Sequence, residues 1–216
     1  MISGIAMYFL DPTSPELGQS RTSLPNSFVP SVRWGIGIDA EDFRLSPTAS
    51  SDRFSFHLAQ PPSPLLAGYW DLRRRIFCEE QGLFKDSDRD DQDAIAYPIA
   101  AVAHTGDAAG QVVGVVRILE SSPRVWYGGR LGVDAAFRRQ NQIGKGLIWK
   151  AVTTANAWGC DRFLATVQIQ NVRFLQRLHW QSLDELEIRG LAHYLMEADL
   201  NYYQPARMLR PRRQAA

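Results

Sequence analysis

The stretch from residue 125 to residue 158 constrains this chain most, because it joins a strand-like run to a helix through a glycine-bearing turn. The strand-like run covers residues 125–133, and the turn reads Arg138-Arg139-Gln140-Asn141-Gln142-Ile143-Gly144-Lys145-Gly146. After the turn, apolar residues recur at helical spacing at Leu147, Ile148, Ala151, Val152, Ala155 and Trp158. This order predicts a helix that begins at the glycine-bearing turn.

The N-terminus of that helix is suited to bind phosphate. Its first backbone N–H groups have no partner within the helix, and they lie at the positive end of the helix dipole. Gly144 and Gly146 have no Cβ, so a pyrophosphate can come close to the backbone. Arg138, Arg139 and Lys145 add positive charge. The turn predicts a site for a phosphorylated cofactor, and an ordinary glycine-rich turn is the alternative.

The common nucleotide-binding motifs do not fit the turn. A P-loop needs Ser or Thr after its Gly-Lys pair, and Gly146 stands there. A dinucleotide-binding fingerprint needs a third small residue where Trp149 stands. A second stretch, residues 35–40, fits G-x-G-x-x-A, but no helical pattern follows it.

The turn instead resembles the acetyl-CoA signature [Gln/Arg]-x-x-Gly-x-[Gly/Ala] of the GNAT N-acetyltransferases, read from Asn141 to Gly146. Asn141 departs from the usual Gln or Arg. Two further segments stand in the family's order. Residues 69–81 resemble its first helix, especially that of ElaA-like members, and residues 171–180 resemble the segment whose Asn holds the pantetheine arm. The resemblance covers about residues 53–203.

A finer resemblance points to one bacterial subfamily. Four segments carry it, at residues 79–84, 126–133, 178–180 and 195–200. They are similar to the nitrogen-starvation N-acetyltransferases that are associated with nitrilase gene clusters. This resemblance implies an N-acyltransferase of nitrogen metabolism and names no acceptor.

The family resemblance implies a cofactor site built largely from backbone. In the family the strand that matches residues 125–133 bulges, and N–H groups near its end bind pantetheine and the thioester carbonyl. The cofactor-binding residues implied here are Leu131, Gly132, Val133, Arg138, Arg139, Asn141, Gln142, Ile143, Gly144, Lys145, Gly146, Asn171 and Phe174. In many members a Tyr protonates the leaving thiolate. Leu175 stands at that position and cannot donate a proton.

Two residues are candidates for proton transfer. Tyr127 lies six residues before Val133, on the same side of a strand by the two-residue period, where some members carry a catalytic Glu. Core packing is the alternative for Tyr127. Glu80, at the end of the first helix, is a candidate base acting through water. The alternative is that Glu80 is only a solvated charge at the end of a helix. His179 and His193 could titrate near neutral pH, but no motif places them.

The acidic segment 86–93 is the candidate for recognising the acceptor. A calcium-binding EF-hand would need Gly where Asp91 stands and Glu where Tyr97 stands, so that motif fails. In the family the segment after the first helix borders the acceptor pocket. Carboxylates there attract a cationic amine, which makes Asp88 and Asp91 candidate substrate contacts. A solvated acidic loop is the alternative.

The pattern of elements predicts an α/β fold with a mixed, mostly antiparallel sheet and helices on both faces, as in acyl-CoA N-acyltransferases. Residues 1–50, rich in Ser, Pro and Gly, read as a loose extension, residues 51–204 as the domain and residues 205–216 as a basic tail. In the first helix Leu65, Tyr69, Leu72 and Ile76 form the predicted buried stripe, with Arg73 facing elsewhere. Gly159 is expected to end the long helix.

Composition limits the class of function. A net charge of +1 argues against a general nucleic-acid binder, and no apolar run is long enough to span a membrane. Two distant cysteines fit a reducing cytoplasm, and four scattered histidines predict no metal site. We expect an enzyme that moves an acetyl group from acetyl-CoA directly to a small, cationic amine, with a homodimer left open. An acyl-homoserine-lactone-synthase-like enzyme and a non-catalytic acyl-CoA sensor are the alternatives.

Overall fold

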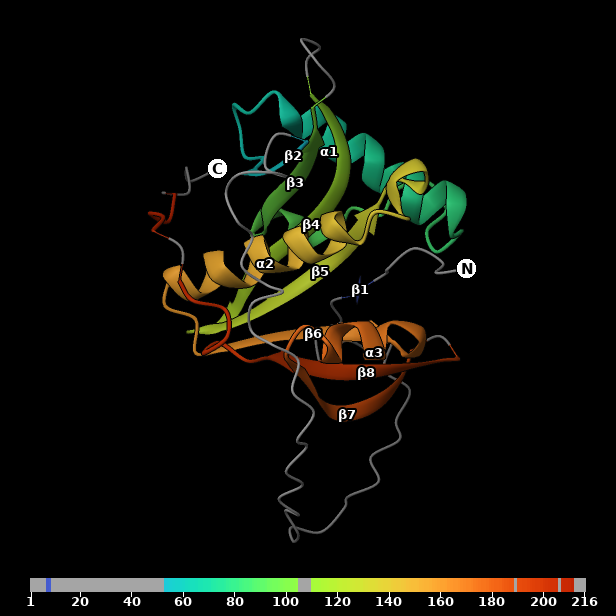
Figure 1. Ribbon diagram of the computed structural model, residues 1–216. Coiled ribbons are helices and arrows are strands. Elements are labelled where there is room, and N and C mark those ends of the chain that lie inside the picture. The colour runs from blue at the N-terminus through green and yellow to red at the C-terminus, as the bar shows by residue number, and fades with distance from the viewer. Residues whose placement is uncertain (1–6, 9–52, 105–109, 189, 206, 212–216) are drawn as a thin grey trace, which may run out of the picture.

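The computed structural model of this chain describes residues 7–8, 53–104, 110–188, 190–205 and 207–211. Its centre is one sheet with the strand order β2-β3-β4-β5-β6-β8-β7, and β1 pairs with β6 beside this path (Figure 1). All strand pairs are antiparallel except β5 with β6, so the predicted mixed sheet is confirmed. The strands are β1 (Met7–Tyr8), β2 (Phe54–Leu58), β3 (Tyr97–Ala103), β4 (Gln111–Ser122), β5 (Val125–Val133), β6 (Arg162–Gln168), β7 (Trp180–Ile188) and β8 (Leu191–Ala198).

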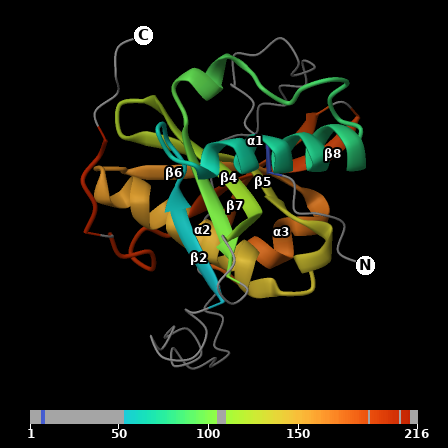
Figure 2. The ribbon, with the colours of Figure 1, turned by 90° about the horizontal axis from the view of Figure 1, so that it is seen from above.

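The helices cover both faces of this sheet (Figure 2). They are α1 (Leu65–Arg74), which continues as a π-helical turn over Arg75–Glu80, α2 (Asn141–Ala157) and α3 (Ile169–Gln176). Short 3₁₀ turns lie at Asp91–Ala94 and Ala135–Phe137. Side chains along β3 alternate, so Ala100 packs with the α1 residues and Ala101 with the α2 residues. None of the helices in the described ranges is long and apolar enough to cross a membrane.

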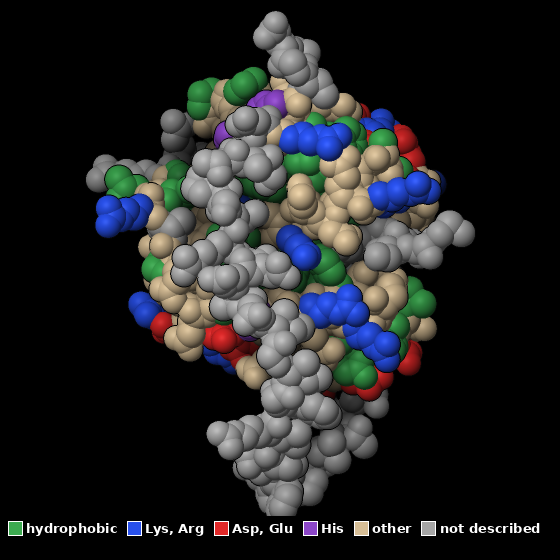
Figure 3. All heavy atoms as spheres, in the orientation of Figure 1, with side chains coloured by type: hydrophobic (Ala, Val, Ile, Leu, Met, Phe, Trp, Pro, Cys, Tyr) green, Lys and Arg blue, Asp and Glu red, His purple; other side chains and the backbone are tan. Residues whose placement is uncertain are grey.

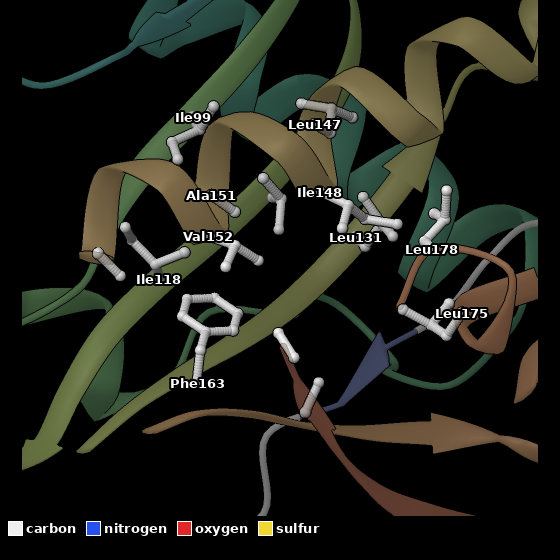
Figure 4. Close-up of a cluster of buried hydrophobic side chains, with 14 of the residues drawn as sticks. Ile99, Ile118, Leu131, Leu147, Ile148, Ala151, Val152, Phe163, Leu175 and Leu178 are labelled. Atoms are coloured by element: carbon white, nitrogen blue, oxygen red, sulfur yellow. The ribbon is translucent and has the colours of Figure 1, made fainter. Parts of the chain in front are cut away.

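The larger core lies between the sheet and α2. The helix buries Leu147, Ile148, Ala151 and Val152, as its helical spacing predicted (Figure 4). A Cβ on Gly114 of β4 would lie 2.8 Å from the side chains of Ile143 and Leu147, so only glycine allows α2 to approach this closely. Gly159 follows the helix with φ +86°, the left-handed conformation expected of a residue that ends a helix.

The predicted orientation of Arg73 is wrong. The periodicity of α1 placed this side chain away from the core, but it is fully buried. Its guanidinium donates to the carboxylates of Asp88 and Asp93, both at 2.7 Å. Burial of a charge is tolerated when it is paired in this way, and both partners lie in the loop after the helix. Helical spacing within α1 carries no information about them.

The two ends of the chain are described in part. At the N-terminal end Met7–Tyr8 pairs with Thr166 and Val167 of β6. The other residues of the predicted extension, with the glycine pattern at 35–40, lie outside the described residues, and the domain boundaries stay a prediction. At the C-terminal end Arg210 is anchored on the domain, where its Nε donates to the Tyr97 hydroxyl.

Candidate functional site

The parallel strands β5 and β6 pair over only three residues each. The ladder runs from Val125 opposite Arg162 to Tyr127 opposite Leu164, and beyond it the strands diverge (Figure 1). β6 continues with β8 on one edge, and on the other edge it pairs with β1, which lies within the opening. On the side of the opening, the backbone groups of residues 128–133 are therefore left out of the β5–β6 ladder. Such groups can bind an extended ligand wherever β1, which also contacts β5, does not cover them.

A β-bulge shapes β5 at this opening, as the family resemblance implied. Val115 pairs with Gly132 and Arg117 with Gly129, so Val116 lies opposite two residues, Arg130 and Leu131. Arg130 has φ +53°, a left-handed conformation that is unfavourable by roughly 1–2 kcal/mol for a residue with a Cβ. Its side chain contacts must therefore hold it there.

Those contacts belong to a cluster of six charged residues, the arginine–aspartate cluster, made of Arg73, Arg117, Arg130, Asp88, Asp90 and Asp93. The three arginines and Asp88 are buried, Asp93 is half-buried and Asp90 is exposed. Arg130 lies 3.2 Å from the Asp88 carboxylate and 3.0 Å from that of Asp90. Arg117 binds Asp90 through two nitrogens, at 2.6 and 2.8 Å. Three positive charges thus meet three negative charges.

The cluster fastens the loop after α1 to the sheet. Arg73 comes from α1, Arg117 from β4 and Arg130 from β5, whereas the three aspartates come from the loop. Burial opposes ionisation of Asp93, but hydrogen bonds from Arg73 and the charge of Arg117 outweigh it and lower the pKa of that carboxyl. The loop is held from three elements, and the bulge in β5 is one of its anchors.

The cluster bears on the two predicted substrate contacts. Asp88 is only 2% exposed, and its carboxylate accepts hydrogen bonds from Arg73 and Arg130. This geometry gives Asp88 a structural role and lends no support to its contact with an acceptor. Asp91 begins a 3₁₀ turn in the same loop and is exposed. Asp91 therefore stays a candidate for acceptor binding.

The start of α2 lies beside the end of β5. Arg138, in the turn between them, donates from Nε to the Val133 carbonyl at 2.9 Å. The residue before the helix, Gln140, makes no side-chain capping bond, so no side chain of that residue covers the first N–H groups. Asn141 and Gln142 are exposed, whereas Ile143 and Gly144 are buried. The predicted phosphate turn and the bulged strand are thus neighbours.

Gly146 has a packing reason to be glycine. A Cβ at this position would come within 2.1 Å of the Phe56 ring on β2. The sequence prediction explained both glycines of the turn by the approach of a pyrophosphate. For Gly146 the contact with β2 already requires the absence of a side chain, and its role toward a cofactor stays a prediction.

Glu80 and Arg138 form an ion pair between the end of the π-helical turn and the phosphate turn. This brings together a predicted base and a predicted cofactor contact. The carboxylate of Glu80 neutralises one of the cations that the turn offers to phosphate. Arg138 contacts only Oε2 of Glu80, so the other carboxylate oxygen can still accept a proton.

Asn171 is the most informative side chain at the opening. It lies on α3 directly after β6, is 1% exposed, and its amide nitrogen has no hydrogen-bond partner among the described residues. An unpaired buried donor is unfavourable by about 1–3 kcal/mol, and a ligand carbonyl would satisfy it. The residue therefore fits the predicted contact with a pantetheine amide. Phe174, one turn later, packs against the main core.

The position of the family's acid is apolar. Leu175 is fully buried and belongs to the main core, as does Leu131 of the bulge, and Figure 4 shows the two side chains with Leu178 at one end of that core. No group at residue 175 can protonate a thiolate.

The other titratable candidates lie at different places along the sheet. Tyr127 lies at the last β5–β6 pair and packs with Leu119 and Leu164. His193 lies opposite Gln168 on β8, and burial lowers the pKa of its imidazole. His179 is exposed and stacks on Tyr202 with ring centroids 3.7 Å apart. No sequence motif marks His193, because its burial results from the pairing of β8 with β6 and not from a local pattern.

The face that presents α2 and α3 is basic. Lys and Arg side chains are spread over its middle, and Asp and Glu side chains lie toward its rim (Figure 3). α2 carries Lys145 and Lys150, α3 carries the exposed Arg173, and the exposed Arg177 directly follows α3. The positive electrostatic potential of these side chains attracts a phosphorylated ligand to the opening.

Comparison with known proteins agrees with this geometry. The profile of the Acetyltransferase (GNAT) family matches residues 66–180. Curated proteins give no significant match.

Solved structures share the fold. A protein of Lactobacillus plantarum assigned as an N-acetyltransferase is 18% identical, with a TM-score of 0.59 over 68% of this chain and 97% of that one. Escherichia coli ElaA is 22% identical, with a TM-score of 0.55 over 68% and 98%. An acyl-CoA N-acyltransferase of Pseudomonas aeruginosa is 18% identical, with a TM-score of 0.52 over 68% and 98%.

Proposed function

This chain belongs to the Acetyltransferase (GNAT) family and is an acyl-CoA-dependent N-acyltransferase, and on that premise we propose that it moves an acetyl group from acetyl-CoA to the amine of a small cationic acceptor. The transfer is direct, without an acyl-enzyme intermediate. The observation that carries the proposal is the juxtaposition of the bulged β5, which parts from β6, with the start of α2.

The residues present fit acetyl-CoA. The first turn of α2, with Arg139 and Lys145 nearby, would hold its phosphates. Backbone groups of Leu131 to Val133 would hold the pantetheine arm and the thioester carbonyl, together with the amide nitrogen of Asn171, which has no partner in the described part of the chain. Acetyl-CoA supplies the activated acyl group. These residues orient it and stabilise the charge that develops on the carbonyl oxygen.

Acetyl transfer forms one C–N bond and breaks one C–S bond. The attacking nitrogen must first lose a proton from its ammonium form, and the sulfur must gain one as it leaves. We assign the first step to Glu80 acting through water, by way of the carboxylate oxygen that Arg138 does not contact, and the second to Tyr127. Tyr127 lies where β5 and β6 part, and Leu175 cannot donate.

The acceptor is recognised by the loop after α1. Asp91 is exposed there and would attract an ammonium group, while the arginine–aspartate cluster holds the loop in place. This leaves Asp88 as a positioning residue of the loop.

The finer assignments rest on the sequence. We place the enzyme with the nitrogen-starvation N-acetyltransferases on the four segments that resemble them. The free thiols of Cys78 and Cys160 suit a reducing cytoplasm.

One observation favours a second function. The fully buried Leu175 removes the usual acid of the family, which a non-catalytic acyl-CoA sensor would not need. Thiol release from acetyl-CoA, measured against a panel of small amines, separates the two functions. The proposed enzyme releases one CoA for each N-acetyl product detected by mass spectrometry. Tight acetyl-CoA binding without release above the hydrolysis background for any amine of the panel would support the sensor.

A further inference from the structure

Three aromatic rings pack against one another at the end of the sheet where β5 begins. Tyr97 comes from β3, Trp126 from β5, and Trp158 from the end of α2. Their ring centroids are 4.7–5.9 Å apart, and the planes are inclined by 32–58°. We call these rings, with the neighbouring carboxylate of Glu120, the cation cage.

The cage is preorganised by the core. Tyr97 and Trp126 are buried in the main hydrophobic cluster, and Trp158 packs against it. Glu120 is fixed as well, because one of its carboxylate oxygens accepts the backbone N–H of Arg124 at 2.9 Å. Ring faces carry partial negative charge, and a carboxylate beside them adds a full one. The cage therefore offers a rigid, electronegative site for a cation.

Its occupant is the guanidinium of Arg210. The guanidinium carbon lies 4.8 Å from the Trp126 centroid, 5.5 Å from that of Tyr97 and 6.0 Å from that of Trp158. Its Nε donates to the Tyr97 hydroxyl at 3.0 Å, and Nη2 lies 2.7 Å from the Glu120 carboxylate. Planar nitrogens with directed N–H groups suit this arrangement better than an ammonium does.

The segment that carries Arg210 has few other attachments. Residues 207–211 form neither helix nor strand, and Leu209 beside Arg210 is 92% exposed. Within the described residues, no backbone hydrogen bond outside helices and strands involves this segment. Arg210 makes the polar side-chain contacts of the segment, while Met208 and Pro211 are half-buried. A side chain on such a tether can be exchanged for the same group from another molecule.

We propose that the cation cage is a binding site for guanidinium groups, and that Arg210 is its intramolecular occupant. The ligand in trans is an arginine side chain of a polypeptide, because the occupant is itself an arginine in an irregular segment. The site is separate from the acyl-transfer site. Trp126 packs on the α2 face of the sheet, whereas the side chain of Tyr127, the next residue along β5, packs in a different cluster on the opposite face.

The test uses the full chain with Arg210→Ala, and Arg207→Ala as the matched control. Arg207 is exposed in the same segment, so its loss removes the same charge and leaves the cage filled. Two probes are titrated by calorimetry and tryptophan fluorescence. One is ethylguanidinium, compared with its neutral analogue ethylurea. The other is a peptide of residues 207–213, compared with the same peptide carrying Arg210→Ala. Arg210→Gln repeats the series if Arg210→Ala folds poorly.

Emptying the cage should expose the site. If Arg210 fills it in at least nine-tenths of the molecules, the parent and Arg207→Ala bind ethylguanidinium at least tenfold more weakly than Arg210→Ala. Adding Glu120→Gln to Arg210→Ala should remove most of the preference for ethylguanidinium over ethylurea. The peptide should bind Arg210→Ala, and its alanine version should not. Equal responses to ethylguanidinium and ethylurea, or equal affinities in all three proteins, would overturn the proposal.

Discussion

Arg130 binds Asp88 twice, through the carboxylate at 3.2 Å and through the backbone carbonyl at 3.1 Å. The two residues are 42 positions apart, and their contact joins the bulge in β5 to the loop after α1. Because Arg130 has a left-handed backbone, the contact also stabilises the conformation that shapes the opening. The loop and the bulge are therefore expected to respond together to substitution.

The first prediction concerns Asp88. Asp88→Ala leaves Arg73 and Arg130 buried without one of their partners, which should lower the free energy of unfolding by about 3–5 kcal/mol. Urea denaturation measures this. Arg130→Gly is the matched variant, because glycine accepts the backbone conformation and removes only the side-chain contacts. A stable Asp88→Ala protein whose only defect is a higher KM for the amine would restore Asp88 as a substrate contact.

Replacing Asp91 should weaken the use of the acceptor amine and leave acetyl-CoA binding unchanged. Asp91→Asn removes an exposed charge, so kcat/KM for a cationic amine should fall by about two- to fivefold, with unchanged affinity for acetyl-CoA. Salt should weaken amine saturation more in the parent than in the variant. Asp86→Asn, an exposed neighbour in the same acidic segment, is the control. Equal losses in both variants would mean that the segment acts only through its overall charge.

Replacing Tyr127 tests its assignment as the proton donor to the thiolate. If its hydroxyl protonates the leaving thiolate, Tyr127→Phe should lower kcat by roughly 10²-fold or more, while the Kd for acetyl-CoA stays the same. Tyr194→Phe, which removes a hydroxyl bonded to Glu185 on the surface, serves as control. A Tyr127→Phe enzyme with parental kcat would assign Tyr127 to packing with Leu119 and Leu164.

Stability should depend on pH through His193. Burial lowers the pKa of this imidazole, so the unfolded chain takes up a proton below about pH 6.5 that the folded chain still excludes. The free energy of unfolding should therefore fall as the pH drops from about 6.5 toward the folded pKa, and stay level above it. His193→Asn should flatten this slope between pH 7.5 and 5.5. An unchanged slope would place the titration elsewhere, and His57, whose pKa is also lowered by burial, is the next residue to replace.

The order of strands and helices was open to prediction from local patterns. The spacing of Leu147, Ile148, Ala151 and Val152 identified the buried side of α2, and Gly159 marked its end. Such signals depend on residues near one another in the sequence, and their physical basis is the period of a helix or strand.

The charged core was not predictable in this way. Arg73 was read as solvent-facing because its partners, Asp88 and Asp93, lie 15 and 20 residues later. Nor does an arginine signal a left-handed backbone, so the position of Arg130 in the bulge could come only from the family resemblance. At the C-terminal end, a charge run read as a basic tail gives no hint that the guanidinium of Arg210 lies over three packed rings.

The proposed function requires acetyl-CoA to bind where α2 begins. Its most direct test is the Kd for acetyl-CoA, measured by calorimetry on the parent, Gly144→Glu and Gln142→Glu. Each variant places a carboxylate at the proposed phosphate site, and Gln142 is exposed, so its variant adds charge without burying it. Gln111→Glu, at the exposed start of β4, adds the same charge elsewhere. We predict at least tenfold weaker binding for Gly144→Glu and Gln142→Glu, and parental binding for Gln111→Glu. Parental affinity in folded Gly144→Glu and Gln142→Glu proteins would contradict the claim.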